Sequence, residues 1–438
     1  MNVSVIGLGK LGSPLVATLA SKGHHVVGVD LKQDLVSKIS QGIAPVEETD
    51  LAKYLKKYKS DIKATTDTEK GVLETDITFI IVPTPSEENG SFSPVFVEEA
   101  ALKIGRALKK KDTYHLVLLT STVMPGTSER IKKLIEIISE KKCGNEFGFC
   151  YNPEFIALGS VIKNLLNPDL ILIGESDKKA GDLTESFYKT CVDNKPYFAR
   201  MNFVNAEISK ISVNTFVTTK ISYANMLSEI CEKIEGANVD VVTATLGQDS
   251  RIGIKYIKGG GAFGGPCFPR DNVAFIHLAK KIGANSDIAQ ATHTINQNQT
   301  NRIVKLIKQN TNGDKPTVGI LGLSYKPYTN VFEESQGFHL LNELSKDNIN
   351  LTVYDPQIKK SDSKLDDIQV HFCKSAKECI STSDIVVITT NWPEFENLIS
   401  SFINGKEKTI IDPWRMLKVD KIPKNVKYIP LGIGTKIN

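Results

Sequence analysis

Short β-branched segments alternate with amphipathic segments in the first half of this 438-residue chain, and this alternation constrains the possible folds more than any other feature. The segments expected to form buried strands are residues 3–6, 25–30, 77–82, 116–120 and 170–173. Amphipathic helical patterns lie between them, at residues 14–22, 33–41 and 95–110. Strands separated by helices of this length form βαβ units with parallel strands. Residues 1–203 are therefore expected to fold as a doubly wound, Rossmann-like α/β domain.

The middle of the chain is expected to be helical. Residues 205–235 contain neither proline nor glycine, and their apolar side chains recur at helical spacing, which predicts one helix of about thirty residues. A further helical stretch is expected from residue 271 to about residue 310. The first helix is longer than one domain usually covers, so we expect it to form the interface of a homodimer.

The α/β alternation restarts after an Asn-Gly-Asp turn at residues 312–314. Strands are expected at residues 317–321, 351–354, 385–389 and 409–412. The fold class is thus α/β, with two doubly wound domains joined by a helical one. The expected domains are 1–203, a central helical domain over 204–311, and a second Rossmann-like domain over 312–438.

The sequence GLGKLG joins the first predicted strand to the first predicted helix. In such a loop the first glycine permits a tight turn, the second leaves room for a pyrophosphate and the third lets the helix pack closely. The N–H groups of the helix N-terminus then bind the phosphates. Asp30 ends the next strand and is expected to accept hydrogen bonds from the adenine ribose, which favours NAD over NADP. The loop residues expected to contact the cofactor are Gly7, Gly9, Lys10, Leu11 and Gly12.

Composition argues against several classes of partner. Lys plus Arg number 54 and Asp plus Glu number 50, so the net charge is only +4. Duplex nucleic acid and anionic membranes both require a concentrated basic field, and neither is expected as a partner. The seven cysteines form no CxxC pair, so neither a zinc ribbon nor a thioredoxin motif, and no metal site, is expected. A disulfide framework is not expected either, because a chain of this length can build large cores. The first residues, MNVSVIGLG, enter a strand directly, and a cytoplasmic protein is expected.

Polar residues follow several of the predicted strands. Thr84 lies in VPTP, Thr122 in STV, and Glu154 follows the strand-like residues 147–151. Ligands gather at the carboxyl edge of a parallel sheet, although residues of these types are also common as turns, helix caps and solvated acids. Lys210 and Asn214 lie four residues apart and therefore on one face of the long helix. A helical lysine is more commonly a simple solvent-exposed residue.

The stretch GGGAFGGPCFPRD, residues 259–271, is the most informative segment of the chain. Its glycines allow the backbone to wrap closely around a ligand, and Cys267 follows them at a predicted helix start. A helix N-terminus favours the thiolate form of a cysteine. Asp271 is expected to cap that helix. The alternative for Cys267 is a buried, inert thiol.

Together these motifs resemble the UDP-glucose/GDP-mannose dehydrogenase family over nearly the whole chain. The matching segments are GLGKLG, VPTP, STVMPGT, NPEF, KISVN, GAFGGPCFPRD and, in the last domain, GLSYKPYT and VYDP. The resemblance implies an NAD-dependent, four-electron oxidation of a nucleotide sugar at carbon six to the uronic acid, with UDP-glucose as the default substrate. It implies that Cys267 is the nucleophile and carries a thiohemiacetal and then a thioester.

The resemblance also implies roles for other residues. Lys210 and Asn214 would stabilise the developing oxyanion, and Asp271 would assist proton transfers. Thr122 would order the catalytic water, and Glu154 would be the base for thioester hydrolysis. The residues implied near the nucleotide sugar are Glu154, Phe155, Lys210, Asn214, Arg251, Phe263, Gly264 and Lys326.

Two departures from the family pattern indicate a divergent subgroup and leave the substrate open. Leu158 stands where the family has a second glutamate after NPEF, and Glu333 stands where it has an arginine. The Arg-to-Glu exchange reverses a charge beside anionic ligands. A UDP-N-acetylhexosamine and GDP-mannose are therefore alternative substrates for the same chemistry.

Two other functional classes remain open at the level of the sequence. One is a two-electron β-hydroxyacid dehydrogenase, which would need neither Cys267 nor a second doubly wound domain. The other is a catalytically inactive protein that binds sugar nucleotides, as the departures at Leu158 and Glu333 would allow.

Overall fold

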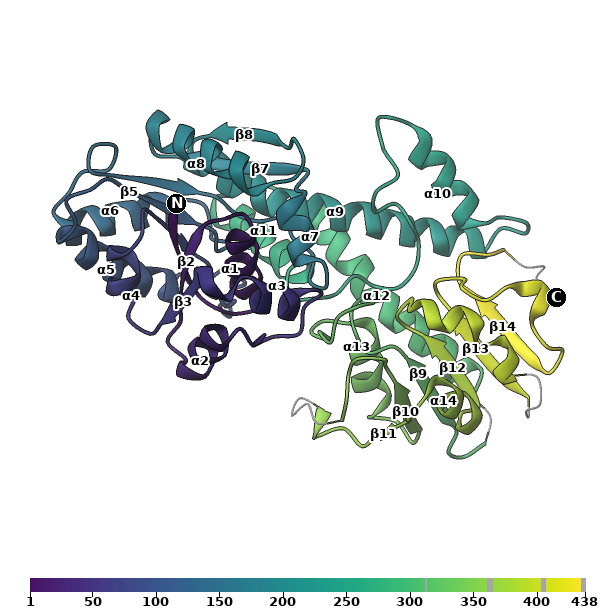
Figure 1. The fold of residues 1–438 in the computed structure, drawn as a ribbon. Coiled ribbons are helices and arrows are strands. Elements are labelled where there is room, and N and C mark those ends of the chain that lie inside the picture. Colours follow the sequence, from purple (N-terminus) through teal and green to yellow (C-terminus); the bar gives the residue numbers. More distant parts are fainter. Residues whose placement is uncertain (312, 361–364, 403–406, 435–438) are drawn as a thin grey trace. The chain divides into compact units, whose positions relative to one another are not determined.

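The computed structural model of the chain describes residues 1–311, 313–360, 365–402 and 407–434, and Figure 1 labels most of the elements. Backbone contacts divide the chain into two compact units, Met1–Ser212 and Val213–Asn438. The three-domain division expected from the sequence stays a prediction. Among the helices of the described residues, none is both long enough and apolar enough to cross a lipid bilayer.

The first unit is built on an eight-stranded sheet in the order β3-β2-β1-β4-β5-β6-β7-β8. Neighbouring strands run parallel, except that β6 and β7 pair antiparallel through Cys150–Glu175 and Tyr151–Gly174. The reversal of strand order at β1 is typical of doubly wound dinucleotide-binding folds. The strands are β1 Asn2–Ile6, β2 His25–Val29, β3 Ile62–Thr65, β4 Ile77–Ile80, β5 His115–Leu119, β6 Phe147–Tyr151, β7 Leu170–Glu175 and β8 Tyr197–Met201.

Helices cover both faces of this sheet, which explains why its central strands are almost wholly apolar. One core joins the sheet to α1, α2, α3, α7 and α8, and a second core joins the opposite face to α4, α5, α6 and the start of α9. Fully buried side chains such as Phe79, Phe149 and Phe187 fill these cores. The helices are α1 Gly12–Ser21, α2 Gln33–Gln41, α3 Leu51–Lys57, α4 Thr68–Leu73, α5 Val95–Lys109, α6 Thr127–Ser139, α7 Val161–Leu166 and α8 Lys178–Cys191.

The second unit contains a six-stranded sheet in the order β11-β10-β9-β12-β13-β14, and all its strand pairs are parallel. This order again reverses at the first strand of the sheet. The strands are β9 Thr317–Leu321, β10 Asn350–Tyr354, β11 His371–Phe372, β12 Ile385–Ile388, β13 Lys408–Asp412 and β14 Val426–Pro430. The predicted fold class, with two doubly wound sheets and a helical middle, is confirmed.

The long central helix is also confirmed: α9 runs from Phe203 to Glu232 over 30 residues. The continuous helical stretch expected from residue 271 to residue 310 is wrong, because the chain breaks it at Gly283, whose φ is +73°. A left-handed residue cannot continue an α-helix, and glycine adopts this conformation without a steric penalty. The helices of this part of the chain are α10 Val239–Gln248, α11 Phe268–Lys281, α12 Asp287–Gln309, α13 Gln336–Leu344 and α14 Ala376–Thr382.

Candidate active site

The glycine loop between β1 and α1 has the geometry of a phosphate-binding turn. Gly7 has a φ of +104°, and a Cβ at this position would lie 2.5 Å from the carbonyl oxygen of Ile81. A Cβ on Gly12 would overlap the carbonyl oxygen of Gly7, whereas a Cβ on Gly9 would meet only open space. Lys10 and Leu11 lie in the turn that leads into α1. No side chain caps the N-terminus of this helix. The loop therefore leaves room above Gly9 for a ligand that binds backbone N–H groups.

Asp30 lies beside this loop, directly after β2. Its Oδ2 accepts a hydrogen bond from the Leu8 N–H at 2.8 Å, and its Oδ1 accepts one from the Lys32 N–H at 2.9 Å. The open space at Gly9 and the carboxylate at the tip of β2 fit a dinucleotide with a free ribose 2′-hydroxyl, as in NAD.

We expect the wild-type protein to use NAD at least about tenfold more efficiently than NADP, because the Asp30 carboxylate would repel a 2′-phosphate. Asp30→Asn should reduce this ratio, whereas Asp34→Asn on the exposed start of α2 should leave it unchanged. The measurement is kcat/KM for each cofactor. Equal efficiencies with the two cofactors in the wild type would contradict the role of Asp30.

Thr84 and Thr122 meet at the carboxyl edge of the first sheet. The Thr84 hydroxyl donates to the Thr122 carbonyl oxygen at 2.8 Å, and Thr84 is only 5% exposed. The two loops that follow β4 and β5 are thus fixed to each other. Their roles in binding the cofactor and in ordering water stay predictions.

Glu154, Phe155 and Lys210 are brought together within the first unit. The Lys210 ammonium donates to the backbone oxygen of Glu154 at 2.6 Å and lies 4.4 Å from the centre of the Phe155 ring. Lys210 is 6% exposed, so it is not the solvent-exposed lysine that is usual on a helix. A buried ammonium beside a carboxyl group can stabilise negative charge as it develops.

The Glu154 carboxyl group sits in a desolvated position. Burial raises its pKa to about 7, against the opposing effects of a hydrogen bond from Tyr188 and the positive charge of Lys210. The Tyr188 hydroxyl lies 3.1 Å from Glu154 Oε1 and 2.5 Å from Asn152 Oδ1. A carboxyl group with a pKa near 7 can exchange protons at neutral pH.

Two residues of this neighbourhood carry no signal in the sequence. Tyr188 comes from α8, and its contact with Glu154 depends on the packing of α8 against the sheet. Glu207 is fully buried one turn before Lys210 and accepts hydrogen bonds from the N–H groups of Gly126 and Ser128 at 2.6 and 2.7 Å. Glu207 thereby binds the start of α9 to the N-terminus of α6.

Leu158, which stands where the family has a glutamate, packs against the apolar core of the first unit.

Cys267 occupies the N-cap position of α11 and is exposed. No side chain caps this helix end. The sequence prediction of a cysteine at a helix start is therefore confirmed, and the positive end of the helix dipole favours its thiolate form.

Asp271 does not cap α11, so this prediction is wrong. It lies four residues after Cys267, too far into the helix for its carboxylate to reach the orphan N–H groups of the first turn. Its Oδ2 instead accepts a hydrogen bond from the Asn214 side-chain amide at 2.6 Å, and its Oδ1 lies 3.5 Å from Arg270 Nε. Asp271 is 1% exposed and Asn214 is 9% exposed. The structure thus joins two of the predicted catalytic residues through a buried hydrogen bond.

Side-chain amides shape the glycine-rich segment before Cys267. Asn225 accepts from the Gly260 N–H at 2.8 Å and donates to the Gly261 oxygen at 3.1 Å. Asn296 makes the equivalent pair of bonds with Phe263, at 2.8 and 2.9 Å. These two side-chain amides fix the backbone of the glycine-rich segment. Nothing in the sequence predicts their contacts with it.

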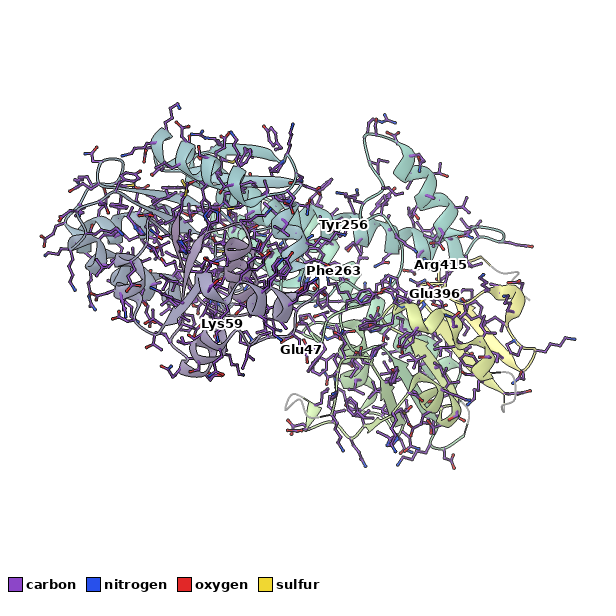
Figure 2. All side chains as sticks on the ribbon, viewed as in Figure 1. Glu47, Lys59, Tyr256, Phe263, Glu396 and Arg415 are labelled. Atoms are coloured by element: carbon purple, nitrogen blue, oxygen red, sulfur yellow. The ribbon has the colours of Figure 1, made fainter. Side chains whose placement is uncertain are left out.

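Two further contacts fix the glycine-rich segment. Arg415, labelled in Figure 2, donates to the Gly259 oxygen at 2.7 Å and forms a bidentate pair with Asp240. Gly264 packs so closely on the Glu334 backbone that a Cβ would overlap it. Phe263, also labelled in Figure 2, is 6% exposed. Substrate contacts of Phe263 and Gly264 stay predictions.

Arg251 and Lys326 were predicted near the nucleotide sugar. Arg251 lies on an exposed turn after α10 and forms a bidentate pair with Asp249, with contacts of 2.6 and 3.0 Å. The Lys326 ammonium lies 5.8 Å from the centre of the Tyr325 ring. The backbone oxygen of Glu333 accepts a hydrogen bond from the Gly265 N–H at 2.9 Å, which places the residue that replaces the family arginine beside the glycine-rich segment.

Three domain profiles of one family match the chain. They are the NAD binding, central and UDP binding domains of the UDP-glucose/GDP-mannose dehydrogenase family, matching residues 1–192, 204–298 and 319–419. A UDP-glucose 6-dehydrogenase of Haloferax volcanii is 33% identical over 95% of this chain and 97% of its own length. A GDP-mannose 6-dehydrogenase of Pseudomonas aeruginosa is 31% identical over 93% of this chain and 95% of its own.

Solved structures agree with these matches. A UDP-glucose dehydrogenase of Pyrobaculum islandicum has a TM-score of 0.89 at 30% identity and covers 99% of this chain and 98% of its own. A UDP-D-ManNAc dehydrogenase of Pyrococcus horikoshii has a TM-score of 0.84 at 25% identity, with 99% of each chain covered. The chain therefore belongs to the UDP-glucose/GDP-mannose dehydrogenase family and is an NAD-dependent dehydrogenase that acts on a nucleotide sugar.

Proposed function

We propose that this protein oxidises UDP-glucose at carbon six to UDP-glucuronate through covalent intermediates on Cys267. The main support for this reaction is the exposed Cys267 thiol at the N-terminus of α11, directly after a glycine-rich segment. On the same helix, Asp271 forms a buried hydrogen bond with Asn214. The nucleotide sugar follows from relatives named as UDP-glucose dehydrogenases in Haloferax volcanii and Pyrobaculum islandicum.

In this proposal the alcohol first loses a hydride to become the aldehyde, and Cys267 then holds the reacting carbon through the second oxidation. Its sulfur adds to the carbonyl carbon of the aldehyde to form a thiohemiacetal, and it later carries the acid as a thioester. An NAD bound at the glycine loop would supply the hydride acceptor for each stage. The Lys210 ammonium and the Asn214 amide stabilise the negative charge on the sugar oxygen, and Asp271 holds the Asn214 amide in place.

Thioester hydrolysis requires a base, and Glu154 has suitable properties for this step. Its pKa of about 7 lets it accept the proton of an attacking water at neutral pH. Thr122, fixed by Thr84 at the carboxyl edge of the sheet, orders that water. The positive charge of Lys210, bound at the Glu154 backbone, favours the ionised form of the carboxyl group that the step needs.

The competing substrates are a UDP-N-acetylhexosamine and GDP-mannose. They are supported by similarity to a UDP-D-ManNAc dehydrogenase of Pyrococcus horikoshii and a GDP-mannose 6-dehydrogenase of Pseudomonas aeruginosa. The deciding experiment is NADH formation by the purified protein with UDP-glucose, UDP-N-acetylhexosamines and GDP-mannose. If kcat/KM is highest with UDP-glucose, the proposed substrate is supported. If kcat/KM is higher with another sugar nucleotide, that compound is the substrate and the proposed reaction through Cys267 is unchanged. The cytoplasmic location expected from the sequence stays a prediction.

We also propose that α9 forms the interface of a homodimer. Several apolar side chains of this helix are exposed, at spacings of three, four and seven residues, which is typical of a helix that pairs with another helix. They are Val213, Phe216, Tyr223, Met226 and Ile230, with exposures of 38% to 67%.

Light scattering should therefore give the mass of a dimer for the wild type, and Phe216→Glu should lower it to that of a monomer. Phe216 is the most exposed residue of this stripe, at 67%, and a buried unpaired charge would be costly at an interface. Glu99→Lys, exposed on α5 and outside α9, is the matched control and should remain dimeric. A monomeric wild type at micromolar concentration would contradict the proposal.

A further inference from the structure

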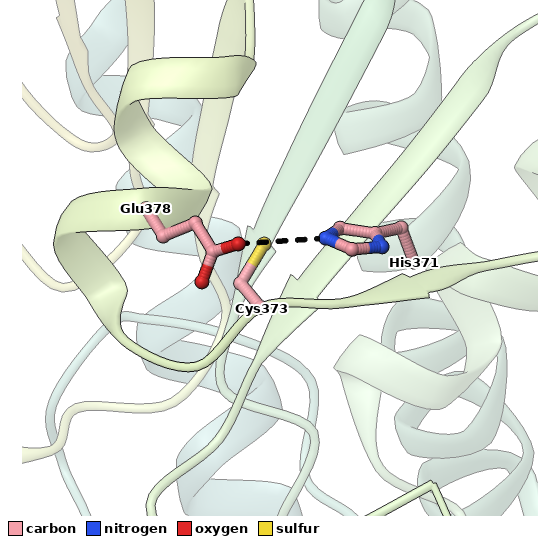
Figure 3. Close-up of side chains that lie close together, drawn as sticks. All are labelled: His371, Cys373 and Glu378. Carbon is pink, nitrogen blue, oxygen red and sulfur yellow. Dashed lines mark ion pairs between the residues drawn. The ribbon is translucent and has the colours of Figure 1, made fainter.

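Three side chains of metal-binding type meet at the edge of the second sheet. They are His371 on β11, Cys373 directly after it, and Glu378 in the first turn of α14 (Figure 3). A ring nitrogen, the thiol sulfur and a carboxylate oxygen of these residues all lie within 4.8 Å of one another. None of the residues assigned above to the oxidation belongs to this cluster.

The spacing of these atoms suits a tetrahedral cation. His371 Nε2 and Glu378 Oε1 are 3.6 Å apart. Zinc binds nitrogen and oxygen ligands at about 2.0–2.2 Å and sulfur at about 2.3 Å, so that neighbouring ligands of a tetrahedral site are separated by about 3.3–3.6 Å. The histidine and the carboxylate thus already stand at the separation of two zinc ligands, and the widest pair of the cluster, within 4.8 Å, would close by up to about 1.2 Å on binding.

The surrounding backbone holds the ligands in place. The Ser375 hydroxyl accepts from the Glu378 N–H at 3.2 Å and caps α14, while the Lys374 N–H, one residue before the cap, donates to Glu378 Oε2 at 2.6 Å. One carboxylate oxygen is thereby bound to the backbone while the other is directed at His371. The Cys373 N–H donates to the Val353 oxygen at 2.9 Å and continues the pairing of β11 with β10. Ligand positions that exist before binding reduce the ordering cost of metal capture.

We propose that His371, Cys373 and Glu378 bind a thiophilic divalent cation, Zn²⁺ by the chemistry of the ligands, with the fourth position open to water on the exposed side of His371. Imidazole, thiolate and carboxylate together form a ligand set that zinc prefers over magnesium or calcium. The bound cation would join edge strand β11 to α14 and displace the thiol proton into solvent.

The experiment is a titration of the chelator-treated full-length protein with Co²⁺, which reports thiolate ligation by a charge-transfer band in the near ultraviolet. We expect one equivalent to produce the band, and Zn²⁺ to displace it. His371→Ala and Cys373→Ser should each abolish the band and weaken Zn²⁺ binding at least tenfold. His371 is exposed, so that His371→Ala is expected to fold even if the cysteine variant does not.

Two controls separate this site from other ligands. His25→Ala removes an exposed histidine that also faces a carboxylate, Asp61 at 3.3 Å, but without a thiol in the pair. Cys267→Ser removes the exposed thiol at α11. Both variants should retain the band. A wild type without the band, a band that survives in His371→Ala, or a band lost in Cys267→Ser would each overturn the proposal, and none of these results depends on which sugar the enzyme oxidises.

Discussion

Cys267→Ala should reduce formation of the uronic acid from the nucleotide sugar at least about a thousandfold, because the aldehyde then forms no thiohemiacetal from which the second hydride can leave. The wild type should produce two NADH for each sugar consumed, without accumulation of free aldehyde. NAD binding should be unchanged in the variant, since the glycine loop and Asp30 belong to the first unit. NADH stoichiometry and a binding titration with NAD measure both expectations.

Two further variants test whether the effect is specific to this thiol. Cys143→Ala removes a partly buried cysteine of the first unit and should retain full activity. Cys267→Ser keeps a weaker nucleophile whose ester hydrolyses more slowly than a thioester, so mass spectrometry should detect a covalent sugar adduct. One NADH for each sugar in the wild type, or full activity in Cys267→Ala, would exclude the covalent route.

Glu154→Gln should lose activity and gain stability at alkaline pH. As the base for thioester hydrolysis, the carboxylate is expected to contribute roughly 10²–10⁴-fold to the rate. The wild-type rate should fall as the pH drops below about 7, where Glu154 becomes protonated. Rapid mixing of the variant with substrate should show a burst of NADH followed by a very slow steady state, as the thioester accumulates.

The stability effect follows from the same pKa, which is raised in the folded protein from 4.5 to about 7. Between these two values the folded state keeps a proton that the unfolded state releases, so that wild-type stability falls as the pH rises. Above pH 7 the loss amounts to up to about 3 kcal/mol. The Glu154→Gln variant lacks this loss, and its thermal midpoint should exceed that of the wild type at pH 8 but not at pH 4.5.

A control carboxylate distinguishes this effect from a general response to amide substitution. Glu99 lies exposed on α5, and Glu99→Gln should shift the thermal midpoint equally little at both pH values. If Glu154→Gln were destabilising at pH 8, the carboxyl group would not be desolvated as the structure indicates.

The fold was predictable because its determinants are local and repeated. Buried parallel strands require continuous apolar runs, and the turn at Gly7 requires a glycine, so both leave clear patterns in the chain. The break between α11 and α12 was missed because a single glycine, Gly283, is compatible with a helix interior unless its backbone is left-handed.

The site was predictable only in part, because its electrostatics depend on contacts between distant segments. Helical spacing could place Lys210 and Asn214 on one face, but it could not show that Lys210 is buried against Phe155. The raised pKa of Glu154 reflects its burial in the folded protein, and the opposing hydrogen bond comes from Tyr188 on α8, far away in the sequence. The cluster of His371, Cys373 and Glu378 leaves no pattern in the sequence for a related reason: the three side chains converge only between an edge strand and the helix that follows it, and their spacing is not that of a CxxC pair.

The buried Glu207 carboxylate has a consequence for how the protein opens. It accepts hydrogen bonds from two N–H groups at the start of α6, so that the first turns of α9 cannot fray without leaving these two backbone donors without their partner. Helix ends normally open independently of the domain core. Here the segment that carries Lys210 is part of the cooperative unit formed by the first sheet and its helices, and a fluctuation that exposes this segment must disrupt the N-terminus of α6 as well.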